Sequence, residues 1–175
     1  VLPYFKRSER RLAICDVNYR GLEGELPITD CDWRHPLCDA FIAGAASQGI
    51  PSGKDYNAGK QEGAGYYQRW IHRGWRVSAA KAFLRPAKGR ANLRVIAHAQ
   101  VSRLVMEGAR VTGVEYAAEP GGPVRRLQAS REVVVAAGAI NSPKLLNLSG
   151  LGDAQRLQDL GIAMQQHLPG VGQGL

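Results

Sequence analysis

The residues best suited to chemistry in this sequence are Ala137 and Gly138, where an apolar run gives way to a glycine. Residues 133–137 are short and apolar enough to form a strand that is buried on both faces. Open α/β sheets bind ligands where their strands end, and small side chains let another molecule approach the backbone closely. We therefore predict that Ala137 and Gly138 contact a dinucleotide cofactor. The alternative is a glycine that serves only the turn.

A helix is predicted to follow this junction. Asn141 or Ser142 can cap the helix by accepting a backbone N–H bond, and Pro143 fits a first turn, where no amide partner is needed. Gly150 is expected to stop the helix. Three leucines give the helix an apolar side that can lie on a sheet: Leu145, Leu146 and Leu148.

Further strands are predicted from apolar alternation and turn residues. One strand is expected at residues 93–97, and three more are expected to form an antiparallel meander: residues 100–106, 111–116 and 124–129. Shorter strands are predicted at residues 26–29 and 66–72. With the buried strand and the helices, this pattern indicates an α+β fold with part of a dinucleotide-binding domain toward the C-terminus.

Two helices are predicted before these strands. The first dozen residues have the pattern of the end of a helix, with basic residues in its last turn. A second helix is expected to start at His35 and to stop at Gly49. Its apolar face, which includes Leu37 and Phe41, is expected to pack on a sheet.

Two shorter helices are predicted from their caps. Ser78 caps a helix over residues 79–84, which is expected to end before a proline. Asp153 caps the last helix, in which Leu157 and Leu160 are expected to point inward.

The composition is that of a globular domain. With 175 residues, 45% of them hydrophobic, the chain is long enough to bury a core. No apolar run approaches the roughly 20 residues that span a bilayer, so no transmembrane segment is expected. The net charge of +8 is spread along the chain as single residues and pairs, without interleaved aromatic residues, so nucleic-acid binding is disfavoured.

Metal binding and covalent hydrolysis are also disfavoured. The four histidines and three cysteines follow no metal-ligand spacing: His35, His72, His98, His167, Cys15, Cys31 and Cys38. A Ser-His-Asp hydrolase would need a G-x-S-x-G turn, and the sequence contains none. Free thiols indicate a reducing compartment, so a cytoplasmic protein is expected, with peripheral membrane association as the alternative.

A longer motif gives the chain a family resemblance. Residues 138–152, GAINSPKLLNLSGLG, resemble the second signature of the glucose-methanol-choline (GMC) oxidoreductases, which oxidise alcohols with FAD. Other segments agree in the family's order: VLPYFKRSE at residues 1–9, EGAGYYQ at 62–68, RVSAAKAFLRPA at 76–87, NLRV at 92–95, AQVSRL at 99–104, VTGVEY at 111–116 and LPGVGQ at 168–173. The resemblance spans nearly the whole chain.

The resemblance implies a fold made of an FAD domain and a six-stranded antiparallel substrate domain. Residues 1–25 would be the end of an FAD-domain helix and the loop on the flavin side. Residues 26–91 would belong to the substrate domain, and residues 92–175 would return to the FAD domain. In the flavin-side loop this chain has Arg20 before a glycine, where the family more often has a histidine.

The resemblance also implies site residues and a reaction. The backbone of Val101 would hold the adenine of FAD, unless Val101 is only an ordinary inward strand residue. Ala137 and Gly138 would contact the adenosine or phosphate side of the cofactor. In the family a histidine removes the proton of the alcohol hydroxyl while hydride passes to flavin N5. No residue of this chain matches that histidine, so no catalytic residue is predicted in it.

The chain is expected to be the central part of a larger enzyme. It contains no G-x-G-x-x-G turn to hold a pyrophosphate, and it stops before the family's catalytic histidine. The alternative is a non-catalytic remnant or an interaction module that kept part of the GMC fold. Gly174 favours that alternative, because the family commonly has an asparagine there.

Overall fold

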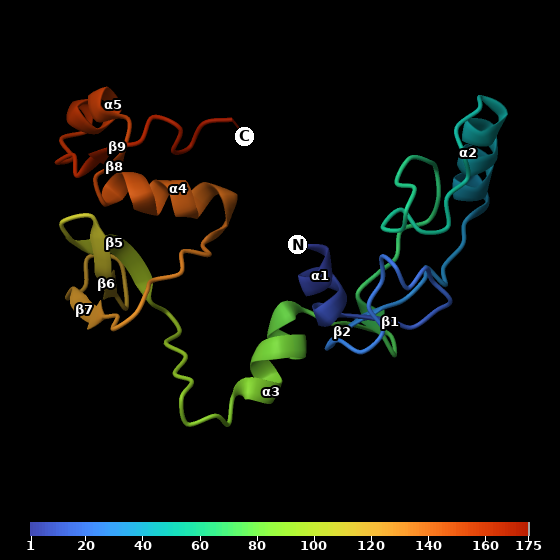
Figure 1. The fold of residues 1–175 in the computed structure, drawn as a ribbon, viewed down its shortest axis with the longest axis horizontal. Coiled ribbons are helices and arrows are strands. Elements are labelled where there is room, and N and C mark those ends of the chain that lie inside the picture. The colour runs from blue at the N-terminus through green and yellow to red at the C-terminus, as the bar shows by residue number, and fades with distance from the viewer. Residues whose placement is uncertain (175) are drawn as a thin grey trace. The chain divides into compact units, whose positions relative to one another are not determined.

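The computed structural model describes residues 1–174. They form two compact units, Val1–Arg94 and Val95–Leu175, which are called unit 1 and unit 2 below (Figure 1). Both units mix helices with small sheets, which confirms the predicted α+β fold. No helix between residues 1 and 174 is long and apolar enough to cross a membrane.

Unit 1 is built around two short strand pairs. Helix α1 (Leu2–Ser8) leads directly into β1 (Glu9–Arg11), which pairs in parallel with β2 (Leu26–Ile28). A second pair, β3 (Ile71–His72) and β4 (Trp75–Arg76), is an antiparallel hairpin. A bridge between Thr29 and Arg69 joins the segment after β2 to the segment before β3. The strand predicted at residues 26–29 is confirmed, but that at 66–72 shrinks to its last two residues.

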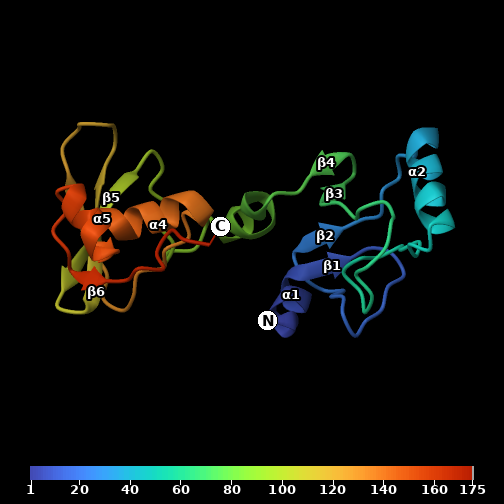
Figure 2. The ribbon, with the colours of Figure 1, turned by 90° about the horizontal axis from the view of Figure 1, so that it is seen from above.

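Helix α2 (Pro36–Ser47) starts where its cap was predicted. The His35 ring accepts a hydrogen bond from the Leu37 N–H at Nδ1, at 3.2 Å, and Gly49 follows the helix with a φ of +83°. The helix buries none of its residues, and Phe41 is 73% exposed. Figure 2 shows α2 at the edge of unit 1, without a sheet beneath it. The expectation that α2 packs on a sheet is therefore wrong for residues 1–174.

A π-helical turn continues the helix that follows Ser78. The Ser78 Oγ accepts a hydrogen bond from the Lys81 N–H at 3.3 Å, as its predicted capping role requires. The π-helix Ala80–Leu84, labelled η1, then passes into α3 (Arg85–Ala87) instead of ending before Pro86. The π turn ends with a hydrogen bond from the Arg85 N–H to the Ala80 carbonyl, and Pro86, which has no N–H to donate, follows directly at the start of α3.

Unit 2 contains the predicted meander. Strands β5 (Gln100–Glu107), β6 (Arg110–Ala117) and β7 (Arg125–Gln128) pair in the order β5-β6-β7, all antiparallel. Helix α4 (Gly138–Leu148) packs against β5. The strand predicted at residues 93–97 is not formed.

The C-terminal part of unit 2 adds a parallel strand pair and a short helix. Strand β8 (Leu151–Gly152) pairs with β9 (Gln166–His167), and α5 (Ala154–Asp159) lies between them in the chain. The Asp153 carboxylate accepts the Arg156 N–H at 3.0 Å, so this predicted cap is confirmed. Leu157 is 1% exposed, as predicted, but Leu160 is 63% exposed and does not point inward.

The junction before α4 differs from its prediction in two ways. Residues 133–137 form no strand, and Val134 is 78% exposed, because residues 1–174 place no strand beside them to complete a sheet. Helix α4 begins at Gly138 rather than near Pro143, which lies inside the helix. The Ser142 Oγ accepts the Ala137 N–H at 3.1 Å. Ser142 therefore holds an amide in front of the helix, not one of its first turn.

Candidate functional site

The backbone at the start of α4 is open. Ala137 and Gly138 are both exposed, and Gly138 has a φ of +89°, a left-handed conformation that favours glycine. A Cβ added to Gly138 would meet no atom within 4 Å. Another molecule can therefore approach this backbone without displacing protein atoms, while the cofactor contact itself stays a prediction.

Val101 lies near the start of β5 and is half-buried. It is paired with Tyr116 of β6, and the register shifts directly after it, between Val101 and Arg103. Such a bulge interrupts the regular pairing of a strand and is common next to functional sites. The Val101 carbonyl accepts a hydrogen bond from the Gln100 side chain at 3.4 Å.

The buried side chain of Ser149 links helix α4 to strand β5. The Ser149 Oγ accepts the Leu104 N–H of β5 at 2.9 Å and donates to the Leu145 carbonyl of α4 at 2.6 Å. The C-terminal end of α4 is therefore fastened to β5, and Gly138 lies at the other end of the helix, about 16 Å along its axis. Ala137 and Gly138 are adjacent, but no hydrogen bond among residues 1–174 joins either of them to Val101.

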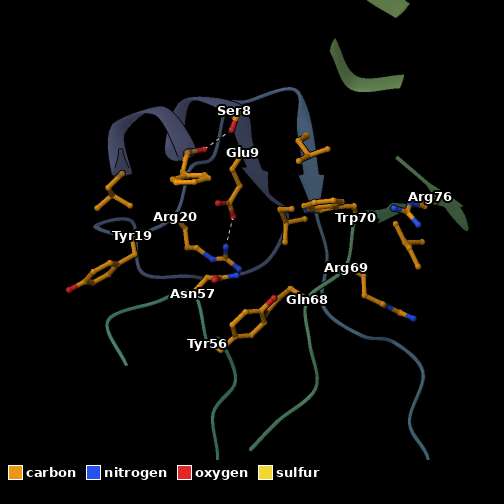
Figure 3. Close-up of a pocket in the computed structure, with 15 residues that line it drawn as sticks. Ser8, Glu9, Tyr19, Arg20, Tyr56, Asn57, Gln68, Arg69, Trp70 and Arg76 are labelled. Carbon is orange, nitrogen blue, oxygen red and sulfur yellow. Dashed lines mark hydrogen bonds and ion pairs between the residues drawn. The ribbon is translucent and has the colours of Figure 1, made fainter. Parts of the chain in front are cut away.

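A second candidate site is a cavity of about 710 Å³ in unit 1 (Figure 3). The segments around α1, β1 and β2 form one side, and Tyr56 and Asn57 from the loop of residues 51–65 form another. Aromatic side chains contribute to the lining, among them Tyr19 and Trp70. A cavity of this size with aromatic and charged walls is suited to a small organic ligand.

A buried ion-pair network lies at the wall of this cavity. The Arg20 Nη1 is 2.9 Å from the Glu9 Oε1, and the Arg20 Nε donates a hydrogen bond to the Asp55 Oδ2, also at 2.9 Å. Arg20 is 5% exposed. The Glu9 contact is an ion pair without hydrogen-bond alignment, and the Arg20 Nη2 has no hydrogen-bond partner. Figure 3 shows Arg20 extended toward Glu9.

A second buried arginine extends this network. The Arg11 guanidinium pairs with Asp30, donates to the Ile28 carbonyl at 3.4 Å, and lies 4.0 Å from the Asp55 Oδ2. Asp55 is therefore placed between two guanidinium groups. Buried charges are costly unless they are paired, and here each arginine meets at least one carboxylate.

Glu9 has a perturbed pKa within the network. Burial is the largest cause and raises the pKa of Glu9 above its ordinary value. The charge of Arg20 lowers this pKa, that of Asp55 raises it, and that of Arg11 lowers it. The net shift is upward, so the two guanidinium groups only partly offset the loss of water around the carboxylate.

The family model of the GMC oxidoreductases matches residues 1–175. The chain belongs to this family. The resemblance seen in the motif at residues 138–152 is thus confirmed. Its curated GMC-type relatives include a human mitochondrial choline dehydrogenase, 45% identical over 174 residues, and an oxygen-dependent choline dehydrogenase from Rhizobium johnstonii, 43% identical over 175 residues.

The alignment covers 99% of this GMC chain with the human relative and 100% with the bacterial one. It covers only 29% and 31% of those relatives, so the chain spans about a third of their length.

Solved structures of oxidoreductases share the fold of this GMC chain. An FAD-dependent oxidoreductase from Chaetomium thermophilum matches 97% of the chain with a TM-score of 0.87 and 28% identity. Pyridoxine 4-oxidase from Mesorbium loti matches 96% with a TM-score of 0.83 and 32% identity. The chain covers 31% and 33% of these two structures.

The ion-pair network is the part of this GMC chain that sequence reasoning missed. Asp55 belongs to no motif in the sequence, and Arg20 stands out only as a departure from the family pattern. The two residues are 35 positions apart, and no local spacing signals that they meet.

Two histidines of the GMC chain, His35 and His167, accept hydrogen bonds from backbone amides. His35 caps α2, and the His167 Nδ1 accepts the Ala154 N–H at 3.0 Å. Within residues 1–174, no group of three or more His, Cys, Asp or Glu residues could hold a metal ion. The three cysteines are free thiols.

Proposed function

We propose that this chain is part of an FAD-dependent oxidoreductase that oxidises the CH–OH group of a choline-like alcohol. The observation that carries the proposal is the 45% and 43% identity with two choline dehydrogenases from distant organisms, across 99% and 100% of the chain. The substrate is then a small-molecule alcohol. The alternative of a non-catalytic remnant is an outcome of the test below.

The residues of unit 2 fit the adenosine side of FAD. Gly138 presents an open backbone with space for another molecule, and Ala137 beside it is small and exposed. We assign Ala137 and Gly138 to this contact, and Val101, next to the bulge in β5, to the contact with the adenine ring. Because the backbone makes these contacts, they need small neighbouring side chains and not particular functional groups.

This assignment implies a separate role for each part of the chain. When bound, FAD supplies the hydride acceptor, flavin N5. Residues 92–175 would hold the adenosine part of the cofactor as a piece of the FAD domain. Residues 1–25 would form the loop on the flavin side, and residues 26–91 would form part of the substrate domain. The cavity of unit 1 would then border the alcohol, whose proton is removed by a base that this chain does not contribute.

The location of the protein is part of the proposal. Free cysteines favour a reducing compartment, and we propose a cytoplasmic protein. Cell fractionation with an antibody against the chain tests this. Recovery in the membrane fraction, released by salt, would instead show peripheral association.

The first experiment uses the whole protein encoded by the reading frame that contains this chain. We expect a yellow protein with a flavin spectrum, which choline bleaches in the absence of oxygen. A colourless protein, or a reading frame without the G-x-G-x-x-G turn and the catalytic histidine, would identify a remnant without turnover.

A pair of glycine variants tests the cofactor contact. Gly138→Ala and Gly161→Ala each place a Cβ on a left-handed glycine in open space, with φ of +89° and +68°. The backbone strain is therefore matched, but only the first Cβ enters the proposed FAD contact. We expect Gly138→Ala to weaken FAD binding about tenfold more than Gly161→Ala. The quantity measured is the dissociation constant of FAD, from a titration in which the released flavin is followed. Equal losses would contradict the assignment.

A further inference from the structure

The loop of residues 51–65 makes its polar contacts with the N-terminal segment through one residue, Asp55, while Gly59 lies so close to the Tyr19 ring that an added Cβ would be 3.1 Å from it. Its backbone hydrogen bonds within residues 51–65 close on themselves, from Gly53 to Ala64 and from Ala64 to Pro51. Within residues 1–174, the only hydrogen bonds and ion pairs that join this loop to residues 1–24 are those of Asp55 with Arg20 and Arg11. Asp55 therefore carries the polar restraint on the position of the loop against that segment.

Asp55 passes this restraint on to the wall of the cavity. Its Oδ2 accepts the hydrogen bond from Arg20 at 2.9 Å, and its Oδ1 accepts the Asn57 N–H at 3.0 Å. The Asn57 bond is a local turn that holds the backbone of residues 55–57. Tyr56 and Asn57 both line the cavity. One carboxylate thus joins Arg20 to the part of the loop that faces the cavity.

The opposite wall is held by the backbone itself. The Arg11 N–H donates to the Gly21 carbonyl at 2.8 Å, and the Gly24 N–H donates to the Glu9 carbonyl at 2.9 Å. A Cβ on Gly21 would lie 1.9 Å from the Lys6 carbonyl oxygen, so this turn packs tightly against the end of α1. Tyr19 and Arg20, which line the cavity, therefore stand on a rigid base.

We propose that Arg20 is a positioning residue that sets the separation of the two cavity walls by pairing with Glu9 on one side and Asp55 on the other. This inference rests on the proposed function, in which the cavity borders the alcohol. A guanidinium suits the task because its nitrogens form a rigid planar fork that can meet two carboxylates at once. A lysine ammonium is a single point charge without that planar fork.

The first test measures the coupling without using turnover. Hydrogen exchange of the whole protein is compared between the parent and Arg20→Lys. We expect faster exchange at residues 53–58, while residues 16–24, which are held by backbone bonds, change little. The matched control is Arg34→Lys, which alters an exposed arginine paired with Asp39 at 3.8 Å outside this cavity. Unchanged exchange at residues 53–58 would overturn the proposal.

The second test measures the effect on the substrate, with choline as the probe. If Arg20 positions the wall, Arg20→Lys raises KM about tenfold and leaves kcat within about twofold, since it changes binding and not the chemical step. Asp55→Asn is the milder variant, because it keeps an acceptor oxygen, and it is expected to change KM in the same direction. A fall in kcat with KM unchanged in both variants would overturn the proposal.

A double-variant cycle completes the test. Arg20→Gln and Asp55→Asn each remove the charge at one end of the same ion pair, so their effects on KM are expected to be less than additive when combined. Full additivity would show that the two residues act separately and would overturn the proposal. A parent protein that choline does not reduce would contradict the proposed function, while hydrogen exchange would still decide whether Arg20 holds the loop.

Discussion

The two units fill their interiors with opposite chemistry. The most buried side chains of unit 2 are apolar, with Leu104, Val105 and Leu157 at 4% exposure or less. In unit 1, the guanidinium groups of Arg11 and Arg20 are buried as deeply as its few apolar core residues. Apolar burial is non-directional, whereas a buried charge needs a partner in a particular place. Unit 1 therefore gains a defined cavity wall from its charges, and unit 2 gains stability from its leucines.

Arg11→Met is expected to have the largest effect on this contrast. It removes the partner of Asp30, whose side chain is 57% exposed, and a 4.0 Å contact of the more buried Asp55, so the expected cost is about 3 kcal/mol, the lower end of the range for a buried pair. Hydrogen exchange should show the loss in β1 and β2, with β5 and β6 unchanged. A variant that is as stable as the parent would mean that the network of unit 1 is replaceable by apolar packing.

Leu157→Ala is the matching change in unit 2. Removing a side chain that is 1% exposed leaves a cavity, and the expected loss is about 3 kcal/mol of unfolding free energy. Leu160→Ala is the control, because this leucine of the same segment is 63% exposed and should cost less than about 0.5 kcal/mol. A denaturant titration monitored by hydrogen exchange in unit 2 distinguishes the two variants. Similar costs would mean that Leu157 is not the centre of the core.

Ser149→Ala tests the one buried polar side chain of unit 2 within residues 95–174. The substitution leaves the Leu104 N–H without its acceptor, which costs about 1–3 kcal/mol. The loss should appear as faster exchange at Leu104 and at the end of α4. Ser102→Ala removes an exposed hydroxyl that donates to the Glu115 carbonyl at 3.2 Å, and it should have little effect. If exchange changes equally in the two variants, Ser149 is not the link between α4 and β5.

Glu9→Gln gives the smallest expected effect, which depends on pH. The pKa of Glu9 is raised in the folded protein, so its contribution to stability is present below its ordinary value of 4.5 and is lost as pH rises through the folded pKa. Glutamine does not titrate. Urea unfolding is measured from about pH 4 to pH 7. The free energy of unfolding of the variant should rise relative to that of the parent as the pH rises. A difference independent of pH would contradict the raised pKa.

Local sequence signals correctly predicted the caps of α2 and α5 and the meander, but not the cap of α4. The caps at His35 and Asp153 form because each side chain reaches an amide two or three residues away. Strands β5, β6 and β7 follow one another through short connections, so their pairing needs no distant information. Predictions that needed a distant partner failed: residues 133–137 found no neighbouring strand, and α2 found no sheet.

In the candidate sites, too, features that depend on neighbouring residues could be predicted from the sequence and contacts between distant residues could not. The open glycine turn at Gly138 follows from small residues in sequence, and Val101 was placed correctly on its strand, while their contacts with FAD stay predictions. The pairing of Arg20 with Asp55 could not be read from spacing. A charged residue in the sequence is expected at the surface, and only the path of the chain shows which charges are buried together.

The amino-acid sequence by itself determined the GMC family, the caps of α2 and α5 and the strands of the meander, because each of these depends on residues close together in the chain. The tertiary structure alone decided that Arg20 lies 5% exposed between Glu9 and Asp55, and that Leu160 faces solvent while Leu157 does not. The physical reason is that burial and charge pairing depend on which segments meet in space. Residues 35 positions apart carry no local record of that meeting.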